Sequence, residues 1–254
     1  MEVYNKAGFI SGAASGLGRA TAVKLSKSGA KLVLIDKNKV GLQTLMNELE
    51  GEHLALEVDV SDASSVAQAV ESGIQKFKEI RFAISCAGIP SSALTVSKGI
   101  AHDLELWQRI IDINLTGTFN LMRHVAAHMC SLNADEDGQR GVIVNTSSIA
   151  AYDGQRGQLA YAASKAAIAG MCLPAARDLA PHGIRVMAIA PGMFDTELIS
   201  NIPPTGIRAI EKNLLCPDRM GNPQEFASMV KFILLNSYVN GTVYRLDGGV
   251  RLCS

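Results

Sequence analysis

The sequence predicts a single doubly wound α/β domain, in which helices cover both faces of a parallel sheet. Short apolar runs alternate with segments of helical periodicity from one end of the chain to the other, and this order builds parallel strands joined by crossover helices. The runs are apolar almost throughout, which is typical of strands buried on both faces. Neither an internal repeat nor a low-complexity linker divides the 254 residues, so we expect one domain over residues 1–254.

Each expected element has a local signal. Seven short apolar runs are bounded by Gly, Pro or Asp, which predicts strands. These are Ala7–Ser11, Lys31–Asp36, His53–Asp59, Phe82–Cys86, Gly141–Ser147, Ile184–Ala190 and Thr242–Leu246. Between the strands, Gly29 and Gly51 end two helices, and Pro223 suits the first turn of another. The expected helices are Gly18–Ser28, Val40–Glu50, Ser61 or Asp62 to about Lys78, Leu104–Cys130, Gln158–Leu179 and Pro223–Asn236.

Two longer segments, at about 88–103 and 194–220, carry no strong helix or strand signal. Both follow the carboxyl end of an expected strand. Ligands bind at that edge of an open α/β sheet, so we expect both segments to be loops that line a substrate site.

Charge and composition exclude several classes of function. Lys and Arg together number 24, as do Asp and Glu, so the net charge is zero, which argues against nucleic acid or an anionic membrane as the partner. The apolar runs are too short to span a bilayer and Met1–Lys6 has no apolar signal core, so we expect a cytoplasmic protein. Five widely separated cysteines suit a reducing compartment.

His124, His128 and Cys130 lie close in sequence but lack a further spaced ligand, so we expect no metal site.

A glycine-rich turn joins the first expected strand to the first helix. Glycines at such a turn allow backbone N–H groups to approach a pyrophosphate, which the helix N-terminus then stabilises. The residues that form this candidate site are Gly12, Ser15, Gly16, Leu17 and Gly18. An ordinary loop is the alternative interpretation, because the spacing is G-x-x-x-G-x-G.

An acidic residue supports the interpretation of this turn as part of a dinucleotide site. Asp36 ends the second strand, where a carboxylate can accept both ribose hydroxyls of an adenosine and repel a 2′-phosphate, so we favour NAD over NADP. Lys37 and Arg19 lie nearby in sequence and can weaken that preference. Asp59 and Val60 close the third strand and are candidates for adenine contacts, although many strands simply end in Asp.

A tyrosine, a lysine and a serine form a candidate catalytic group. Tyr161 and Lys165 are spaced i and i+4, so they share one helical face. A phenol with a pKa of about 10 becomes a useful base near a cation, and Lys165 and an oxidised nicotinamide each supply positive charge. Ser148 lies just beyond the fifth strand, where its hydroxyl can bind a substrate oxygen while Tyr161 exchanges the proton. A surface pair is the alternative for Tyr161 and Lys165 taken alone.

With these motifs in this order, the chain resembles the short-chain dehydrogenase/reductase family over nearly its whole length. The resemblance implies a Rossmann-like fold and marks Asn114 as a fourth catalytic residue, whose backbone carbonyl holds a relay water. It also implies further cofactor neighbours, which are Cys86, Ala87, Gly88, Pro191, Gly192, Phe194 and Thr196. Two positions depart from the family pattern: Ser11 replaces a threonine and Ser85 replaces an asparagine.

Within the family, the sequence most resembles the type II 3-hydroxyacyl-CoA dehydrogenases. This resemblance implies an acyl-CoA thioester as substrate, with Gln155 in contact with it, a homotetramer, and the mitochondrial matrix as an alternative compartment. The alternatives that remain are an NADPH-dependent reductase of acyl-carrier-protein thioesters or other carbonyls, a hydroxysteroid dehydrogenase, and a scaffold that keeps the fold but acts through partners.

Overall fold

The computed structural model describes residues 1–197 and 214–252, and it confirms the α/β fold class. Within these residues, seven parallel strands form one sheet in the order β3-β2-β1-β4-β7-β8-β9. Their bounds are β1 (Ala7–Ser11), β2 (Lys31–Asp36), β3 (His53–Glu57), β4 (Ile80–Ser85), β7 (Gly141–Thr146), β8 (Ile184–Pro191) and β9 (Val243–Leu246). The strand order reverses between β1 and β4, which creates the crevice where open α/β sheets bind ligands.

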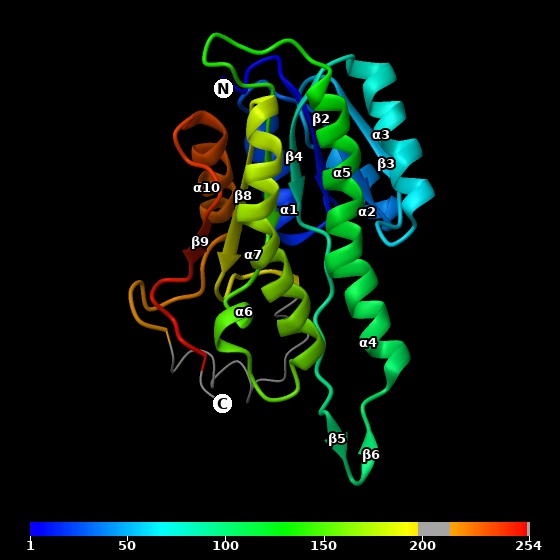
Figure 1. Cartoon of the computed structure of the whole chain (residues 1–254), viewed down its shortest axis with the longest axis vertical. Coiled ribbons are helices and arrows are strands. Elements are labelled where there is room, and N and C mark those ends of the chain that lie inside the picture. The colour runs from blue at the N-terminus through cyan, green and yellow to red at the C-terminus, as the bar shows by residue number, and fades with distance from the viewer. Residues whose placement is uncertain (198–213, 253–254) are drawn as a thin grey trace.

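Helices cover both faces of the sheet, as the sequence predicts (Figure 1). On one face lie α1 (Gly16–Ser26), α2 (Lys39–Met46) and α10 (Pro223–Leu235), which pack on one apolar core cluster. On the other face lie α3 (Ala63–Phe77), α5 (Gly117–Cys130) and α7 (Leu159–Leu179), which pack on a second cluster. The arrowheads of β4, β8 and β9 point toward the lower part of Figure 1, so the ligand-binding edge lies there.

Side-chain caps explain where several helices begin. The side chain of Asp62 accepts hydrogen bonds from the backbone N–H groups of Ser64 and Ser65 at the start of α3. At α10, Asn222 and Glu225 form a reciprocal capping box, with Pro223 in the first turn. The observed starts of α3 and α10 therefore lie within a few residues of the expected ones, and capping hydrogen bonds stabilise both.

Three features differ from the elements expected from the sequence. The expected helix Leu104–Cys130 is α4 (Leu104–Ile111), a π-helical turn (Asp112–Thr116) and α5 in succession. The expected loop at 88–103 contains an antiparallel hairpin of β5 (Val96–Ser97) and β6 (Ile100–Ala101), seen at the bottom of Figure 1. A short helix, α6 (Ala150–Asp153), follows β7.

The hairpin has a simple physical cause. Lys98 and Gly99 at its tip have φ angles of +50° and +78°, the left-handed pair that a tight two-residue hairpin turn requires. The strands have only two residues each, too few for an alternating pattern to be visible in the sequence. Of the second expected loop, residues 198–213 lie outside the described part of the chain.

Candidate active site

The glycine-rich turn lies at the carboxyl end of β1, packed closely against the end of β4. Gly12 has a φ of +64°, and a Cβ atom there would lie 2.7 Å from the backbone nitrogen of Ala87. A Cβ on Gly18 would collide with the carbonyl oxygen of Gly12. The Ser11 hydroxyl accepts hydrogen bonds from the backbone N–H groups of Cys86 (3.2 Å) and Ala87 (3.3 Å). The serine that replaces the family threonine therefore still joins β1 to β4.

The N-terminus of α1 opens directly from this turn. Ser15 precedes the helix but makes no capping hydrogen bond through its side chain, and no acidic residue lies in the first turn. Gly16 has a φ of +51° there, and Leu17 follows it in the first turn. The first N–H groups of an eleven-residue helix thus face the crevice without a competing carboxylate, an arrangement that suits an anionic group.

The Asp36 carboxylate is fixed beside the glycine-rich turn. It accepts hydrogen bonds from the backbone N–H groups of Ala14 (3.0 Å) and Asn38 (2.9 Å), one on each oxygen. Each carboxylate oxygen retains a further lone pair for a ligand hydroxyl. Arg19, which we expected to weaken a preference for NAD, forms an ion pair with Glu48.

A cleft of about 400 Å³ lies between Lys37, the residue after Asp36, and α4. The Asp59 carboxylate is held there by the backbone N–H and the hydroxyl of Ser61, which lower the pKa of Asp59. Val60 packs against Gly117 at the start of α5. The residues that line this cleft are Lys37, Asp59, Ser61, Glu105, Gln108, Arg109, Asp112 and Ile113.

Ser148, Tyr161 and Lys165 come together at the carboxyl ends of β4 and β7. The Ser148 hydroxyl is hydrogen-bonded to the Tyr161 phenol and accepts a 3.1 Å hydrogen bond from the backbone N–H of Ala150. The Lys165 ammonium lies 5.8 Å from the centre of the Tyr161 ring and donates a 2.9 Å hydrogen bond to the carbonyl oxygen of Thr146. The two side chains of the i, i+4 pair therefore lie next to each other on one face of α7.

Burial is the largest cause of the pKa shifts of Lys165 and Tyr161. Lys165 is only 4% exposed, and burial lowers its pKa to about 8. Burial also raises the pKa of Tyr161, while the hydrogen bond with Ser148 opposes that rise. This direction differs from the lowered pKa expected from the sequence, because in the chain by itself burial outweighs the polar contacts.

Asn114 lies in the π-helical turn, and its side chain is fully buried. Its amide accepts a hydrogen bond from the Ile89 N–H (2.8 Å) and donates to the Ile89 carbonyl (3.0 Å) and to the Ser164 hydroxyl (3.1 Å). A Cβ on Gly88 would lie 3.2 Å from the Asn114 side-chain oxygen and 3.4 Å from the Lys165 ammonium. The side chain thus anchors the start of the 88–103 segment beside Lys165, a role that the sequence does not reveal.

The remaining expected cofactor neighbours line the same edge of the sheet. Burial raises the pKa of Cys86 to about 11, so it remains a thiol at neutral pH. The Gly192 N–H donates to the Leu246 carbonyl (2.9 Å), which fixes the turn that begins at Pro191. Phe194 packs edge-to-face on Phe226 in the core. The Thr196 methyl lies 3.5 Å from the Cβ position of Gly16, so Thr196 reaches the glycine-rich turn.

The loop between α6 and α7 contacts the 88–103 segment. The Ala93 N–H donates a 2.8 Å hydrogen bond to the Gly157 carbonyl, which joins the two loops. Gln155 is half-buried in the same loop, and its N–H donates to the Gln158 side chain (3.1 Å). The two loops therefore lie side by side where this hydrogen bond joins them. In residues 1–197 and 214–252, no cluster of three or more His, Cys, Asp or Glu is arranged to hold a metal.

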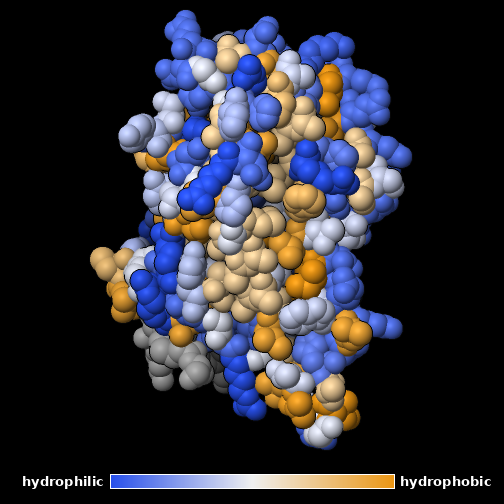
Figure 2. All heavy atoms as spheres, in the orientation of Figure 1, coloured by the Kyte–Doolittle hydropathy of each residue, from blue (hydrophilic) through white to orange (hydrophobic). Residues whose placement is uncertain are grey.

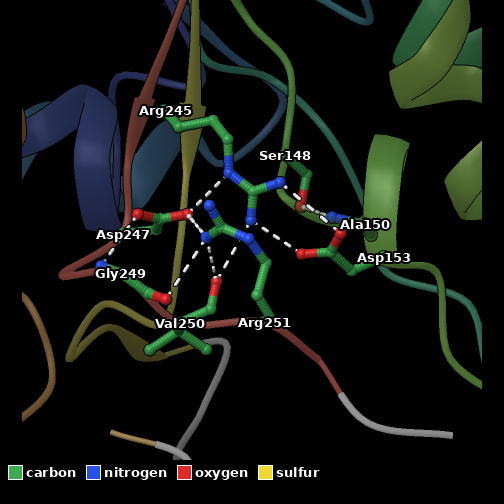
Figure 3. Close-up of polar contacts among 8 residues, drawn as sticks. All are labelled: Ser148, Ala150, Asp153, Arg245, Asp247, Gly249, Val250 and Arg251. Carbon is green, nitrogen blue, oxygen red and sulfur yellow. Dashed lines mark hydrogen bonds and ion pairs between the residues drawn. The ribbon is translucent and has the colours of Figure 1, made fainter. Parts of the chain in front are cut away.

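Sequence reasoning overlooked one polar cluster near this site. Arg245, at the end of β9, binds Asp153 of α6 and Asp247 together (Figure 3). Asp153 and Arg245 are 92 residues apart, so no local pattern connects them. The Arg-Leu-Asp sequence of residues 245–247 was the only available signal.

Comparisons with known proteins agree with this geometry. The family model for short chain dehydrogenases matches residues 6–205. The 3-hydroxyacyl-CoA dehydrogenases type-2 of Drosophila melanogaster and Homo sapiens are 42% and 45% identical to this chain. They align over 98% and 96% of it and over 99% and 94% of their own lengths. The crystal structure of 3-hydroxyacyl-CoA dehydrogenase type-2 from Mycobacterium avium has a TM-score of 0.93 and 36% identity, and the match covers 100% of this chain and 99% of that one. The chain is an oxidoreductase that belongs to the short-chain dehydrogenase family.

Proposed function

We propose that this enzyme uses NAD to interconvert a 3-hydroxyacyl-CoA and a 3-oxoacyl-CoA. The observation that carries the reaction class is the contact of Ser148 with Tyr161, with the Lys165 ammonium 5.8 Å from the same ring. The substrate class rests on the names of the relatives, since proteins called 3-hydroxyacyl-CoA dehydrogenase type-2 align along nearly the whole chain.

The crevice fits a nicotinamide dinucleotide. The glycine-rich turn has no room for a side chain at Gly12, and the α1 N-terminus follows the turn directly. We assign the pyrophosphate to this turn, the adenosine ribose to Asp36 and the adenine to Asp59 and Val60. The nicotinamide end falls to the Pro191–Thr196 segment. When bound, this group supplies the hydride acceptor for alcohol oxidation and the donor for ketone reduction.

The residues of the chain handle the proton and the substrate oxygen. We assign Ser148 to donate a hydrogen bond to the reacting oxygen, which steers it toward Tyr161. Tyr161 takes the hydroxyl proton during oxidation and returns one during reduction. With a pKa of about 8, Lys165 is mostly protonated at neutral pH, so it stabilises the phenolate form of Tyr161. The Asn114 side chain holds Ile89 and Gly88 against Lys165, and the backbone carbonyl of Asn114 belongs to the proposed proton relay.

Asp36 supports NAD rather than NADP as the cofactor. Its carboxylate is fixed by Ala14 and Asn38 at the edge of the crevice, where the extra phosphate of NADP would meet a like charge. Arg19 is already paired with Glu48, so it offers little compensation. Lys37 and Arg109 are cations that line the adjoining cleft.

An NADH-consumption assay tests the substrate class. Acetoacetyl-CoA is compared with its pantetheine thioester, with an acyl-carrier-protein thioester and with free ketones of similar size. We expect turnover of the CoA thioester at a kcat/KM at least ten times that of the others. A preference for the acyl-carrier-protein thioester would favour a 3-oxoacyl reductase, the name of a Thermotoga maritima relative that is 35% identical over 98% of this chain. A preference for free ketones would contradict the CoA assignment.

We also propose that α7 packs against a second copy of the chain. The stretch Leu159–His182 is long and apolar enough to cross a membrane by length and composition, and only a third of its most apolar window is buried. It packs along β8 and carries Tyr161 and Lys165, so we assign its outer face to a subunit interface instead. Figure 2 shows a weakly hydrophobic area across the middle of the molecule, where α7 lies in Figure 1.

Gly170 on α7 offers a direct test of this interface. A Cβ atom at Gly170 meets nothing within 4 Å in the single chain, so a side chain there leaves the protomer intact. We expect the wild type to be a tetramer by light scattering and Gly170→Glu to dissociate, with unchanged far-UV circular dichroism. A monomeric wild type would contradict the proposal.

A further inference from the structure

The guanidinium of Arg245 lies between two carboxylates from different parts of the chain (Figure 3). It binds Asp153 through Nη2 (2.7 Å) and Asp247 through Nε (2.7 Å), and Nη2 also donates to the Val250 carbonyl (3.1 Å). Its side chain is only 23% exposed. The planar fork of arginine can hold two acceptors in fixed directions, whereas the ammonium of lysine cannot reproduce that geometry.

One arm of this cluster leads to Ser148. Asp153 is the last residue of α6, and Ala150, its first, donates its N–H to the Ser148 hydroxyl (3.1 Å). A helix of four residues is not stable by itself, so its place depends on contacts outside it. Arg245 supplies such a contact through Asp153, and its guanidinium also lies 5.2 Å from the centre of the Tyr152 ring.

The other arm leads to the turn at Gly192. A Cβ on Gly192 would lie 2.8 Å from the Asp247 Cα atom, so the two backbones are in close contact. The Gly192 N–H also donates to the Leu246 carbonyl (2.9 Å). Arg245 therefore joins the helix that orients Ser148 to the segment that supports the Pro191–Gly192 turn.

We propose that Arg245 is a positioning residue for the reaction: its bridge from Asp153 to Asp247 fixes where Ser148 stands relative to Tyr161 and the nicotinamide side of the crevice. This inference rests on the proposed function of Ser148 and Tyr161. Loss of the bridge frees α6, loosens the Ser148–Tyr161 hydrogen bond and slows the chemical step, while the adenosine side of the crevice stays intact.

Another arginine that binds a carboxylate provides a control for structural effects alone. Arg81 binds Glu79 through Nε (3.1 Å) and Nη2 (2.7 Å) and donates to the Asn133 carbonyl (2.7 Å). Its side chain is 10% exposed, and it lies at the start of β4, at the opposite edge of the sheet from the active site. Replacing Arg81 by lysine removes a comparable arginine–carboxylate contact without touching α6.

The experiment compares Arg245→Lys, Asp153→Asn, the double variant and Arg81→Lys by steady-state kinetics between pH 6 and 10. We expect each single change in the Arg245 cluster to lower kcat by 10- to 100-fold, with the KM for NADH within about threefold of wild type. The double variant should be no slower than the slower single variant, because both residues act through one contact. Arg81→Lys should lose stability in urea but keep the wild-type kcat.

A spectroscopic titration separates this inference from the proposed function. The ultraviolet absorbance of tyrosinate, taken as the difference from Tyr161→Phe, reports the protonation of Tyr161 without any turnover. We expect Arg245→Lys and Asp153→Asn to shift this titration to higher pH and Arg81→Lys to leave it unchanged. An unshifted titration and an unchanged kcat in Arg245→Lys would overturn the positioning role. An inactive wild type would overturn the proposed function, while the titration would still decide the role of Arg245.

Discussion

Lys165 and Tyr161 face each other across one helical turn, with the ammonium 5.8 Å from the centre of the phenol ring. The ammonium is buried, and its one hydrogen bond found in the described residues goes to the Thr146 carbonyl. Burial lowers the pKa of Lys165 to about 8, so keeping this ammonium charged inside the protein costs free energy of folding. This arrangement is consistent with a functional rather than a stabilising role for Lys165.

The first prediction is that Lys165→Met stabilises the protein at neutral pH while it abolishes activity. The unfolded pKa is about 10.4 and the folded value is about 8, so below pH 8 the wild type bears the full cost of burying the charge. Between those values the folded lysine loses its proton first, and wild-type stability rises with pH. We expect a gain for Lys165→Met of about 1–3 kcal/mol at pH 6.5 in urea unfolding, and a smaller gain at pH 9.5. An equal gain at both values would contradict the buried charge.

The second prediction concerns Tyr161→Phe, which removes only the phenol oxygen. We expect kcat to fall by at least about a thousandfold, because the proton of the reacting oxygen then has no acceptor at the right place. NADH binding, followed by fluorescence, should stay within about threefold of wild type, since the proposed adenosine contacts are made elsewhere. Turnover close to the wild-type rate would exclude Tyr161 as the acid and base.

The third prediction is that Asp36→Asn weakens the preference for NADH over NADPH. Asparagine keeps a side-chain oxygen that can accept from Ala14 or Asn38, so the turn is retained while the negative charge is lost. We expect the ratio of kcat/KM for NADH to that for NADPH to fall by about 10- to 100-fold, equivalent to about 1.4–2.7 kcal/mol. An unchanged ratio would show that Asp36 does not bind the adenosine ribose of the cofactor.

The fourth prediction compares two serines that pair across β1 and β4 in the sheet register, Ser11 and Ser85. Both are 2% exposed, but the Ser11 hydroxyl accepts two backbone N–H groups, while the Ser85 hydroxyl has no partner among the described residues. We expect Ser11→Ala to lower the free energy of unfolding by about 1–3 kcal/mol and Ser85→Ala to leave it unchanged or raise it by up to about 1 kcal/mol. Urea unfolding of both variants decides this, and equal losses would contradict it.

Ser85 also shows how far the sequence could predict this site. The sequence marks Ser85 as a place where the amide expected from the family pattern is missing. The structure adds that Ser85 lies opposite Asn145 on β7, and that the Ser85 hydroxyl and the Asn145 side-chain oxygen are both buried without a hydrogen-bond partner in the described residues. Patterns confined to a few residues were sufficient for the strands, the glycine-rich turn and the Tyr161–Lys165 pair, because their period or spacing is local.

Long-range contacts account for what the sequence could not predict. The side chain of Asn114 binds Ile89, 25 residues away, and Arg245 binds Asp153, 92 residues away. Neither pairing leaves a periodic signal. The π-helical turn that carries Asn114 was also missed, because α4, this turn and α5 follow one another without a break in the helix. The burial that raises the pKa of Tyr161 in the chain by itself also depends on the whole fold, so no local pattern predicts it.

The fifth prediction concerns Gly12→Ala, which places a methyl group 2.7 Å from the backbone nitrogen of Ala87 at a residue whose φ is +64°. Backbone cannot move aside as a flexible side chain can, so the ends of β1 and β4 must move apart at this contact. Gly138→Ala is the control, because Gly138 has a φ of +78° but nothing within 4 Å of its Cβ position. We expect Gly138→Ala to cost about 1 kcal/mol of backbone strain and to bind NADH normally. Gly12→Ala should lose at least about 2 kcal/mol and weaken NADH binding more than tenfold. If both variants bound NADH equally well, the close contact between Gly12 and Ala87 would not be what shapes the crevice.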